Sequence, residues 1–249
     1  MKVQLIDYTG IGHSDVWYAA RKLIRAKNTR MPSSFVERVS EMNGYDIVKE
    51  LEAIAMTIRS SWEFVSYTFT VNDISRATCD QMTRTRVGVA FAVMTQRVTD
   101  LKDFKYVVPG AISERKELEV LYHDHMTRTS AFYALLIENG ISTQDARSIL
   151  PMATHSPLTA EYNLRSLADL VGKRQNLRAQ GEYSDVVAEM AHQVICVHPW
   201  TEMFLYPERT KTPTLDKMLK EALGDRTVNE RPEVGKALKE VDLLKGTWG

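Results

Sequence analysis

WEFVSYTFTVNDISRATCDQMTRTR, residues 62–86, places a strand pattern directly before a helix pattern. In residues 62–71, aromatic and β-branched side chains alternate with other residues, which is typical of a strand. Residues 74–86 then have a helical pattern, on which Gln81 and Arg84 share a face because they lie three positions apart. The segment therefore predicts a strand that leads into a polar, arginine-bearing helix end.

The apolar run VGVAFAVM, residues 87–94, follows this helix directly. Arg84 and Arg86 precede the run and Arg97 follows it, although apolar runs are normally buried and arginine normally is not. Two interpretations are open. Either the chain passes through a core between two solvated ends, or the arginines bind a shared anionic ligand.

The rest of the chain is mostly helical in pattern, with one further strand expected at residues 3–9. Apolar spacing predicts helices at residues 14–27, 45–61, 113–140, 142–151, 160–175 and 183–199. Gly140 and Pro151 provide stop signals for two of them. Residues 29–40 are polar and contain a proline, which indicates a loop or a short helix.

A few early strands followed by a larger number of helices indicate an α+β fold, that is, a helix-dominated α/β fold. The chain of 249 residues is long enough to bury a substantial core. We expect one domain at residues 1–206. A charged C-terminal helical tail is expected at residues 207–249, with a helix at residues 214–224.

The composition argues against several classes of protein. The 32 Lys and Arg residues balance the 32 Asp and Glu residues, so broad neutralisation of nucleic acid phosphates is not expected. The chain contains no run of about 18 apolar residues, so no membrane span is predicted. Its first residues lack the basic and then apolar pattern of a secretion signal. Two cysteines are too few for a disulfide framework, so we expect a reducing, cytoplasmic setting.

The histidines do not predict a metal site. His123 and His125 lie two positions apart, so they do not share a helix face and cannot converge on one ion. His192 and His198 flank Cys196 without a repeated ligand spacing. We therefore expect no bound metal.

Signals for a phosphate loop or a reactive thiol are weak. TGIGHSD, residues 9–15, offers two glycines without the third of a dinucleotide-binding loop, so a turn is the better interpretation. Cys79 lies near arginines that could activate it, but a small buried side chain is the favoured role.

Three arginines stand beside core-facing segments. Arg147 precedes the apolar SILP, Arg165 precedes a serine and a leucine, and Arg174 lies at the end of the same expected helix as Arg165. Taken singly, such residues usually form surface ion pairs. Guanidinium groups that start from core-facing backbone favour a fork-shaped anion, and phosphate is the natural one.

At this point a family resemblance becomes visible. Residues 59–86 resemble the central segment of the flavin-dependent thymidylate synthases. In that family a strand of the form FEHxxFTF leads into a helix that ends in a Gln-x-x-Arg-His-Arg motif. The matching residues are Glu63, Gln81, Arg84, Thr85 and Arg86.

Residues 146–190 are similar to the second half of the same family. They contain an Ala-Arg-x-x-Leu-Pro turn, an Asn-x-Arg-Ser-Leu helix, a further arginine and an Ala-Gln-x-Glu sequence. HPWTEMFL, residues 198–205, resembles the family's Cys-Pro-Trp segment, so the likeness runs from about residue 1 to residue 206 with its motifs in the family's order. The matching residues are Arg147, Asn163, Arg165, Arg174, Ala179, Gln180 and Glu182.

The chain also departs from the family pattern. Thr85 stands where the motif has its histidine. Residues 95–97 match a family Ser-x-Arg only after a one-residue insertion, and the apolar residues 89–93 replace a polar Asn-Glu pair. Further departures are Asp169 in place of an asparagine, Arg178 in place of a flavin-contacting histidine, and the missing histidine in residues 56–62.

The resemblance implies one thymidylate synthase complementing protein-like domain with a central mixed sheet and long helices. It also implies an enzyme that converts dUMP to thymidylate with FAD, NADPH and methylene-tetrahydrofolate, and a homotetramer whose sites lie between subunits. Arg174 would be the catalytic residue, since it would bind a pyrimidine carbonyl and stabilise negative charge on the ring. The nucleotide would contact Gln81, Arg84, Thr95, Arg97, Arg147 and Arg174, and the FAD would contact Glu63, Arg84, Thr85, Arg86, Asn163, Arg165 and Asp169.

The family's phosphate-holding residues match better than its base-facing ones, which leaves two alternatives. One is a related flavin- and folate-dependent enzyme that acts on another pyrimidine deoxynucleotide, such as a hydroxymethylase or a deoxycytidylate methylase. The other is a nucleotide-binding relative without catalysis. In each case the resemblance implies that residues 79–100 are a helix end and the loop after it, with Arg97 reaching a nucleotide phosphate in a neighbouring subunit.

Overall fold

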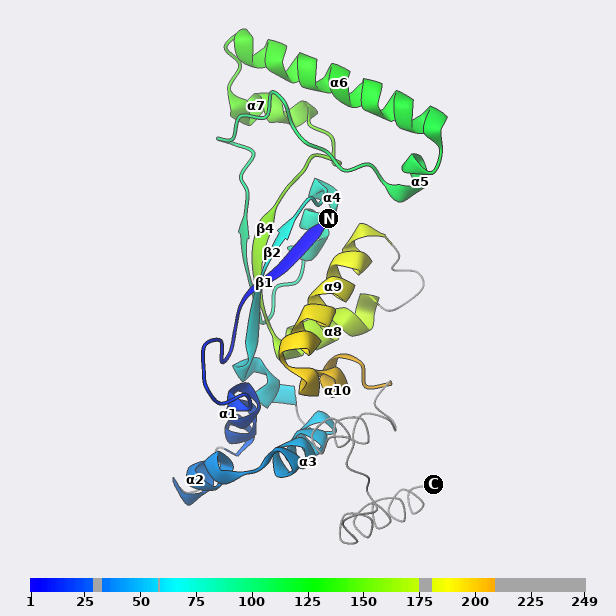
Figure 1. Cartoon of the computed structure of the whole chain (residues 1–249). Coiled ribbons are helices and arrows are strands. Elements are labelled where there is room, and N and C mark those ends of the chain that lie inside the picture. The colour runs from blue at the N-terminus through cyan, green and yellow to red at the C-terminus, as the bar shows by residue number, and fades with distance from the viewer. Residues whose placement is uncertain (29–32, 58, 175–180, 209–249) are drawn as a thin grey trace. The chain divides into compact units, whose positions relative to one another are not determined.

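The computed structural model describes residues 1–28, 33–57, 59–174 and 181–208, and the described residues up to Tyr206 form one compact unit. A small sheet is accompanied by a larger number of helices, so the expected helix-dominated α+β architecture is confirmed (Figure 1). The helix expected at residues 214–224 lies outside the described residues, and the helical tail stays a prediction.

Four strands form the central sheet, in the order β1, β2, β4, β3. Their bounds are Lys2–Tyr8 for β1, Ser66–Asn72 for β2, Leu158–Asn163 for β4 and Val89–Val93 for β3. All three pairings are antiparallel, so the mixed sheet implied by the resemblance is wrong for the described strands. For the first pairing, the reason lies in the connection from β1 to β2. Its helices gather beyond one end of the sheet, so β2 starts beside the end of β1, where Tyr8 pairs with Tyr67.

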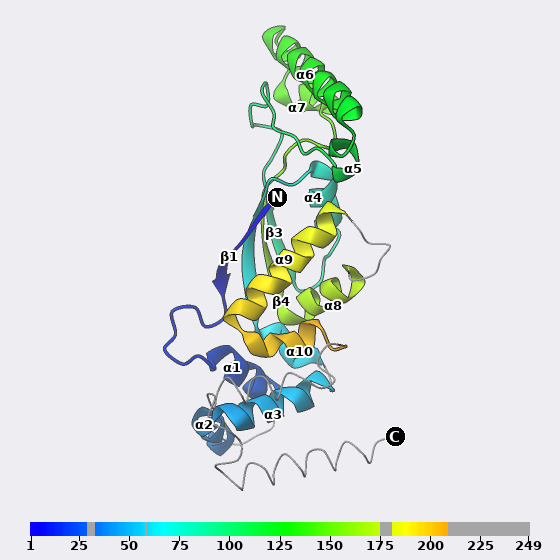
Figure 2. The ribbon, with the colours of Figure 1, turned by 45° about the vertical axis from the view of Figure 1, so that its right-hand side comes forward.

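Strand β2 shows why the pattern of residues 66–72 is so clear. Tyr67, Phe69 and Val71 are fully buried, whereas the residues between them are half-exposed. Helices α8 (Leu164–Arg174) and α9 (Glu182–Val197) cover one face of the sheet (Figure 2). A sheet covered on one face requires this alternation, because successive side chains point to opposite faces.

Two segments differ from the sequence-based expectation. Residues 89–93 form the edge strand β3 and not a loop, because their backbone pairs with β4 and Phe91 packs edge-on against Tyr162 with ring centroids 5.8 Å apart. Residues 160–163 were expected to open a helix, but they end β4, which pairs with a strand on each side. Periodicity over four residues cannot separate a strand end from a helix start, and the pairing partners decide between them.

The segment before β2 also differs from its prediction. Helix α3 (Gly44–Ala55) ends earlier than expected, and residues Arg59–Phe64 form the 3₁₀ helix η1 where the strand pattern had begun. Trp62 of η1 is 2% exposed and packs edge-on against Phe204 of α10 (Glu202–Leu205), with ring centroids 4.7 Å apart. This packing explains why Trp62 belongs to the core without belonging to the strand. Helices α1 (Tyr18–Lys27) and α2 (Ser33–Glu41) complete this end of the unit.

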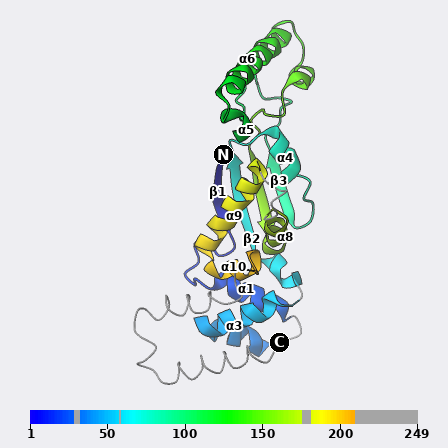
Figure 3. The same cartoon turned by 90° about the vertical axis from the view of Figure 1, so that its right-hand side faces the viewer.

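The longest helix, α6 (Lys116–Glu138), lies beyond the opposite end of the sheet together with the short helices α5 (Gly110–Ser113) and α7 (Thr143–Ala146), as Figure 3 shows. Met126 and Tyr133 on α6 pack with Leu101, Phe104 and Ala146 in a cluster of their own. Elsewhere α6 carries large apolar side chains that are exposed in the chain by itself, among them Val120 (66%), Leu121 (64%), Phe132 (51%) and Leu135 (51%). Among the described helices, including this one, none is long and apolar enough to cross a membrane.

His198 is a buried histidine in the core. Its Nδ1 lies 2.9 Å from the Tyr67 hydroxyl, and the edge of the Tyr8 ring packs against it. Burial lowers the pKa of His198 from 6.5 to about 4, because the charged imidazolium would lose its hydration. The described residues also contain no group of three His, Cys, Asp or Glu side chains placed to hold a metal ion.

The lowered pKa of His198 predicts a loss of stability in acid. Between pH 6.5 and pH 4 the unfolded histidine binds a proton that the folded one excludes, so falling pH favours unfolding. We expect this group to remove up to about 3 kcal/mol of unfolding free energy between pH 7 and pH 4. Urea unfolding at several pH values measures the effect. In His198→Gln, which keeps an acceptor for Tyr67 but does not titrate, that share of the pH dependence should vanish; an unchanged slope would contradict the prediction.

Candidate functional site

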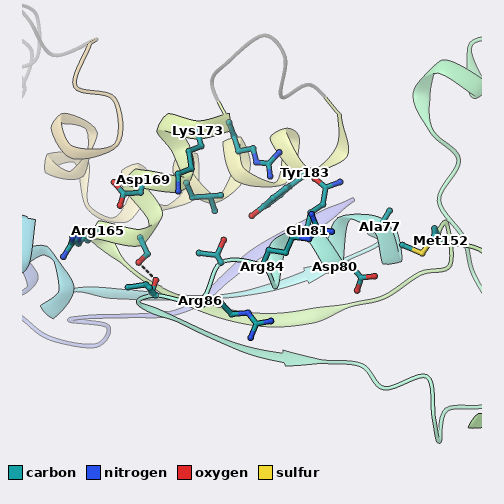
Figure 4. A pocket seen from close by; sticks show the side chains of 15 residues that line it. Ala77, Asp80, Gln81, Arg84, Arg86, Met152, Arg165, Asp169, Lys173 and Tyr183 are labelled. Carbon is teal, nitrogen blue, oxygen red and sulfur yellow. Dashed lines mark hydrogen bonds between the residues drawn. The ribbon is translucent and has the colours of Figure 1, made fainter.

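A cleft of about 860 Å³ opens between helix α4 (Arg76–Met82), the turn after it and helix α8 (Figure 4). This volume lies in the range of about 300–1,000 Å³ that is common for small-molecule sites. The turn carries the Arg84-Thr85-Arg86 motif, and Tyr183 of α9 extends into the cleft from the other side. The polar and charged lining residues are Asp80, Gln81, Arg84, Thr85, Arg86, Arg165, Ser166, Asp169, Lys173, Arg174 and Tyr183.

Glu182 fixes helix α4 at one side of the cleft. Its carboxylate accepts hydrogen bonds from the Ser75 backbone N–H (3.0 Å), the Ser75 hydroxyl (2.5 Å) and the Thr78 hydroxyl (2.6 Å). Ser75 is the N-cap of α4, so the carboxylate also lies at the positive end of the helix dipole. Because Glu182 is the first residue of α9, the contact ties α4 and its Gln81 to the helix that carries Tyr183.

Asn163 and Ser166 fix the other end of the motif turn. The Asn163 side chain accepts from the Ser166 N–H at 2.8 Å and so caps α8, while the Ser166 hydroxyl donates to the Val87 carbonyl at 2.6 Å. Gly88 has φ +68°, and a Cβ at this position would overlap the side chains of both Asn163 and Ser166. Only glycine therefore fits the position where the motif turn meets α8.

The charges of the cleft are not balanced within the described residues. Asp80 pairs with Arg76 at 2.8 Å and Asp169 pairs with Arg59 at 2.8 Å, so both carboxylates of the lining are already engaged outside the cleft. Arg165 pairs with Glu63 at 2.5 Å. No described carboxylate forms an ion pair with the remaining cations of the lining, which are Arg84, Arg86, Lys173 and Arg174. A concave site with several uncompensated cations attracts an anion.

Within this cationic group, Arg174 contacts the ring of Tyr183. The Arg174 guanidinium lies 4.0 Å from the centroid of the Tyr183 ring, within the range of a cation–π interaction. Burial raises the pKa of Tyr183, and the neighbouring Thr85 hydroxyl and Arg174 charge oppose that rise. The tyrosine hydroxyl is therefore a neutral donor at physiological pH.

A second basic cluster lies at α7 and does not line the cleft. Arg97 Nη2 donates to the Gln144 side chain at 2.8 Å, and Arg147 Nε donates to the Gln144 carbonyl at 3.2 Å. The Thr95 hydroxyl accepts from the Arg97 N–H at 3.2 Å. Arg97 and Arg147 thus both contact Gln144, and Thr95 contacts Arg97, on a part of the chain other than α4 and α8.

Comparison with known proteins identifies the family. The family model for thymidylate synthase complementing protein matches residues 4–200. The chain belongs to this family. It is 28% identical to a flavin-dependent thymidylate synthase from Geobacter sulfurreducens over 80% of this chain and 84% of the relative. The corresponding enzyme of Pyrococcus furiosus is 30% identical over 78% and 79%, and that of Nitratidesulfovibrio vulgaris is 31% identical over 67% and 70%. The resemblance drawn from the motifs is confirmed.

The family motifs account for most of the cleft. Of the residues expected to bind nucleotide or flavin, the structure brings seven together in its lining, namely Gln81, Arg84, Thr85, Arg86, Arg165, Asp169 and Arg174. Glu63 and Asn163 stand behind the lining, in the contacts with Arg165 and with α8 described above. Thr95, Arg97 and Arg147 form the separate cluster. Ala179 and Gln180, which also match the family, lie outside the described residues, as does Arg178.

Sequence reasoning missed Lys173 and Tyr183 in the lining of the cleft. Lys173 lies four positions after Asp169, a spacing that places both on one side of a helix, and this signal could have found it. Tyr183 had no such signal, because its partner Arg174 lies on another helix. Cys79 is 1% exposed, as expected of a small buried side chain, and burial raises its pKa. The hydroxyl of Tyr106 lies 2.6 Å from His123 Nδ1.

Proposed function

We propose that this chain is a flavin-dependent thymidylate synthase, which transfers a one-carbon unit from methylene-tetrahydrofolate to C5 of dUMP, with NADPH as reductant. The observation that carries the proposal is the cleft itself. The family's Gln-x-x-Arg-x-Arg residues and its second-half helix meet there and leave four cations without a carboxylate partner among the described residues. A phosphorylated ligand matches this charge.

The positive charge of the cleft residues matches the negative charge of the FAD pyrophosphate. Arg84 and Lys173 have no described carboxylate partner, and they would bind the pyrophosphate of FAD together with Arg165. Thr85 would meet the flavin with a hydroxyl in place of the family's imidazole. In Figure 4 Arg86 extends to the side away from α8, so it would meet a different part of the ligand from Lys173. The flavin, when bound, supplies the redox chemistry of the reaction.

The nucleotide site would be shared between subunits of a homotetramer. Gln81, Arg84 and Arg174 line the cleft, while Thr95, Arg97 and Arg147 lie together elsewhere on the chain. One nucleotide phosphate can be held by both groups if the second comes from a neighbouring copy. The exposed apolar side chains of α6 support this assembly, because contact with a neighbouring copy would remove them from water. The two cysteines are free thiols, in keeping with the proposed cytoplasmic setting.

Arg174 would act on the pyrimidine ring in the proposed reaction. Its guanidinium lies over the Tyr183 ring, where it would bind a ring carbonyl and stabilise the negative charge that develops as C5 attacks the one-carbon unit. Gln81 and Arg84 would orient the nucleotide through its phosphate, which lowers the entropic cost of reaching the reactive geometry.

The proposal predicts a flavoprotein that releases the C5 hydrogen of dUMP. The purified chain, given FAD, should show visible flavin absorption that NADPH bleaches. With methylene-tetrahydrofolate present it should release tritium from dUMP labelled at C5, since the new carbon replaces that hydrogen. A chain that takes up no flavin and releases no tritium would disprove the proposal. Release from labelled dCMP without release from dUMP would instead establish the alternative enzyme, which modifies another pyrimidine deoxynucleotide.

A further inference from the structure

Few contacts with described residues hold the side chain of Arg174 in place, although its proposed role requires a defined orientation. It is the last residue of α8, it is half-exposed, and no described carboxylate pairs with it. An arginine side chain has many rotamers, and an unrestrained one would have to be ordered again in each catalytic cycle. Among the described residues, the contact that restrains its guanidinium is the ring of Tyr183, 4.0 Å away.

Tyr183 is itself rigidly held. Its side chain is 4% exposed, and it lies in the first turn of α9 directly after Glu182. Glu182 is bound to Ser75 and Thr78 at the start of α4, so the ring of Tyr183 is fixed relative to the helix that carries Gln81. Adjacent residues of α9 thus connect the two halves of the cleft. Glu182 holds α4, and Tyr183, the next residue, supports Arg174.

The hydroxyl group of Tyr183 contributes little to this arrangement. It is buried and makes no hydrogen bond of normal geometry with a described residue. Thr85, Tyr162 and Arg174 nevertheless lie close enough to interact with it, and they lower its pKa against the rise that burial causes. A buried hydroxyl without a partner costs stability, so the ring and not the hydroxyl is the part of Tyr183 that stabilises the native structure.

We propose that Tyr183 is the positioning residue for Arg174, and that its aromatic ring holds the guanidinium in the orientation that binds the substrate ring. This inference rests on the proposed function, and it assigns a role to a residue outside the family motifs matched above. A cation–π contact changes an equilibrium by roughly twofold at exposed sites and by up to roughly thirtyfold when desolvated. Arg174 is half-exposed, so its contact lies between these limits.

The first test compares Tyr183→Leu with Tyr183→Phe. Leucine removes the aromatic face, and we expect kcat for dUMP to fall roughly tenfold, the fold-change that about 1.4 kcal/mol produces. Phenylalanine keeps the face and loses only the unpartnered hydroxyl, so kcat should recover to within about threefold of wild type without a loss of stability. If both variants lose activity equally, the hydroxyl carries the role and the inference is wrong.

The second test asks whether Tyr183 acts through Arg174. In the double variant Tyr183→Leu/Arg174→Ala, the tyrosine change should lower kcat no further than Arg174→Ala alone, because the group it positions is already gone. Additive losses would overturn the inference. Met190→Ala is the matched structural control, since Met190 is fully buried in the same helix and does not line the cleft. It should lower the urea midpoint and leave kcat unchanged; a kcat loss equal to that of Tyr183→Leu would also overturn the inference.

The proposed function and this inference can fail separately. If the wild-type chain binds neither FAD nor dUMP and releases no tritium, the proposed function is wrong and the inference falls with it. If the wild-type chain is active and Tyr183→Leu matches it in kcat, the inference alone is wrong.

Discussion

Replacing Arg174 with alanine is expected to lower kcat for tritium release from dUMP by about 10²–10³-fold, as the loss of one preorganised donor does in other enzymes. The guanidinium lies in the cleft over Tyr183, where it can donate to a ring carbonyl and stabilise negative charge as it develops. KM for dUMP should change less than kcat, because that charge is present in the transition state and not in the bound substrate.

Two further variants make the Arg174 experiment decisive. Arg174→Lys keeps a positive charge but loses the planar donor fork, so its kcat should lie between those of wild type and Arg174→Ala. Arg38→Ala removes an exposed arginine of α2 outside the cleft lining and should leave kcat unchanged. A kcat for Arg174→Ala within tenfold of wild type would remove Arg174 from the proposed mechanism.

Replacing Gly88 with alanine is expected to destabilise the fold by several kcal/mol. The position has φ +68°, where a side chain is strained, and the new methyl group would overlap the side chains of Asn163 and Ser166. Relief of that overlap has to rotate Asn163 and Ser166 out of their hydrogen bonds or move the motif turn and the start of α8, which border the cleft. The urea midpoint should fall, and the remaining folded protein should bind FAD more weakly.

Gly172→Ala is the matched control for Gly88→Ala. Gly172 lies inside α8, has no positive φ, and a Cβ there would meet no atom of a described residue within 4 Å. Alanine favours a helix interior over glycine by about 0.5–1 kcal/mol, so this variant should be slightly more stable than wild type. If Gly88→Ala and Gly172→Ala have the same urea midpoint, Gly88 is not needed for the close packing of the motif turn against α8.

Much of the fold was open to prediction from local patterns. The alternation in β2, the helix of residues 76–82 and the long helix α6 each follow from periodicity within a single segment. The apolar run after the motif was different. Its strand forms at an edge of the sheet, and its only described pairing partner, β4, lies some 70 positions further along the chain. Periodicity within the run contains no information about that partner, so the loop expectation failed.

The features of the candidate site also divide into those that the sequence identifies and those that only the tertiary structure decides. The sequence alone determined the family and which residues match its motifs, among them Gln81, Arg84 and Arg174, and it predicted an anionic ligand, because motif spacing and side-chain chemistry are local properties. Only the tertiary structure decided which charges remain uncompensated. Asp169 pairs with Arg59, 110 positions away, and Glu182 binds Ser75, 107 positions away. Such contacts, like the ring of Tyr183 beneath Arg174, depend on how separate helices pack, and no spacing within one helix encodes them.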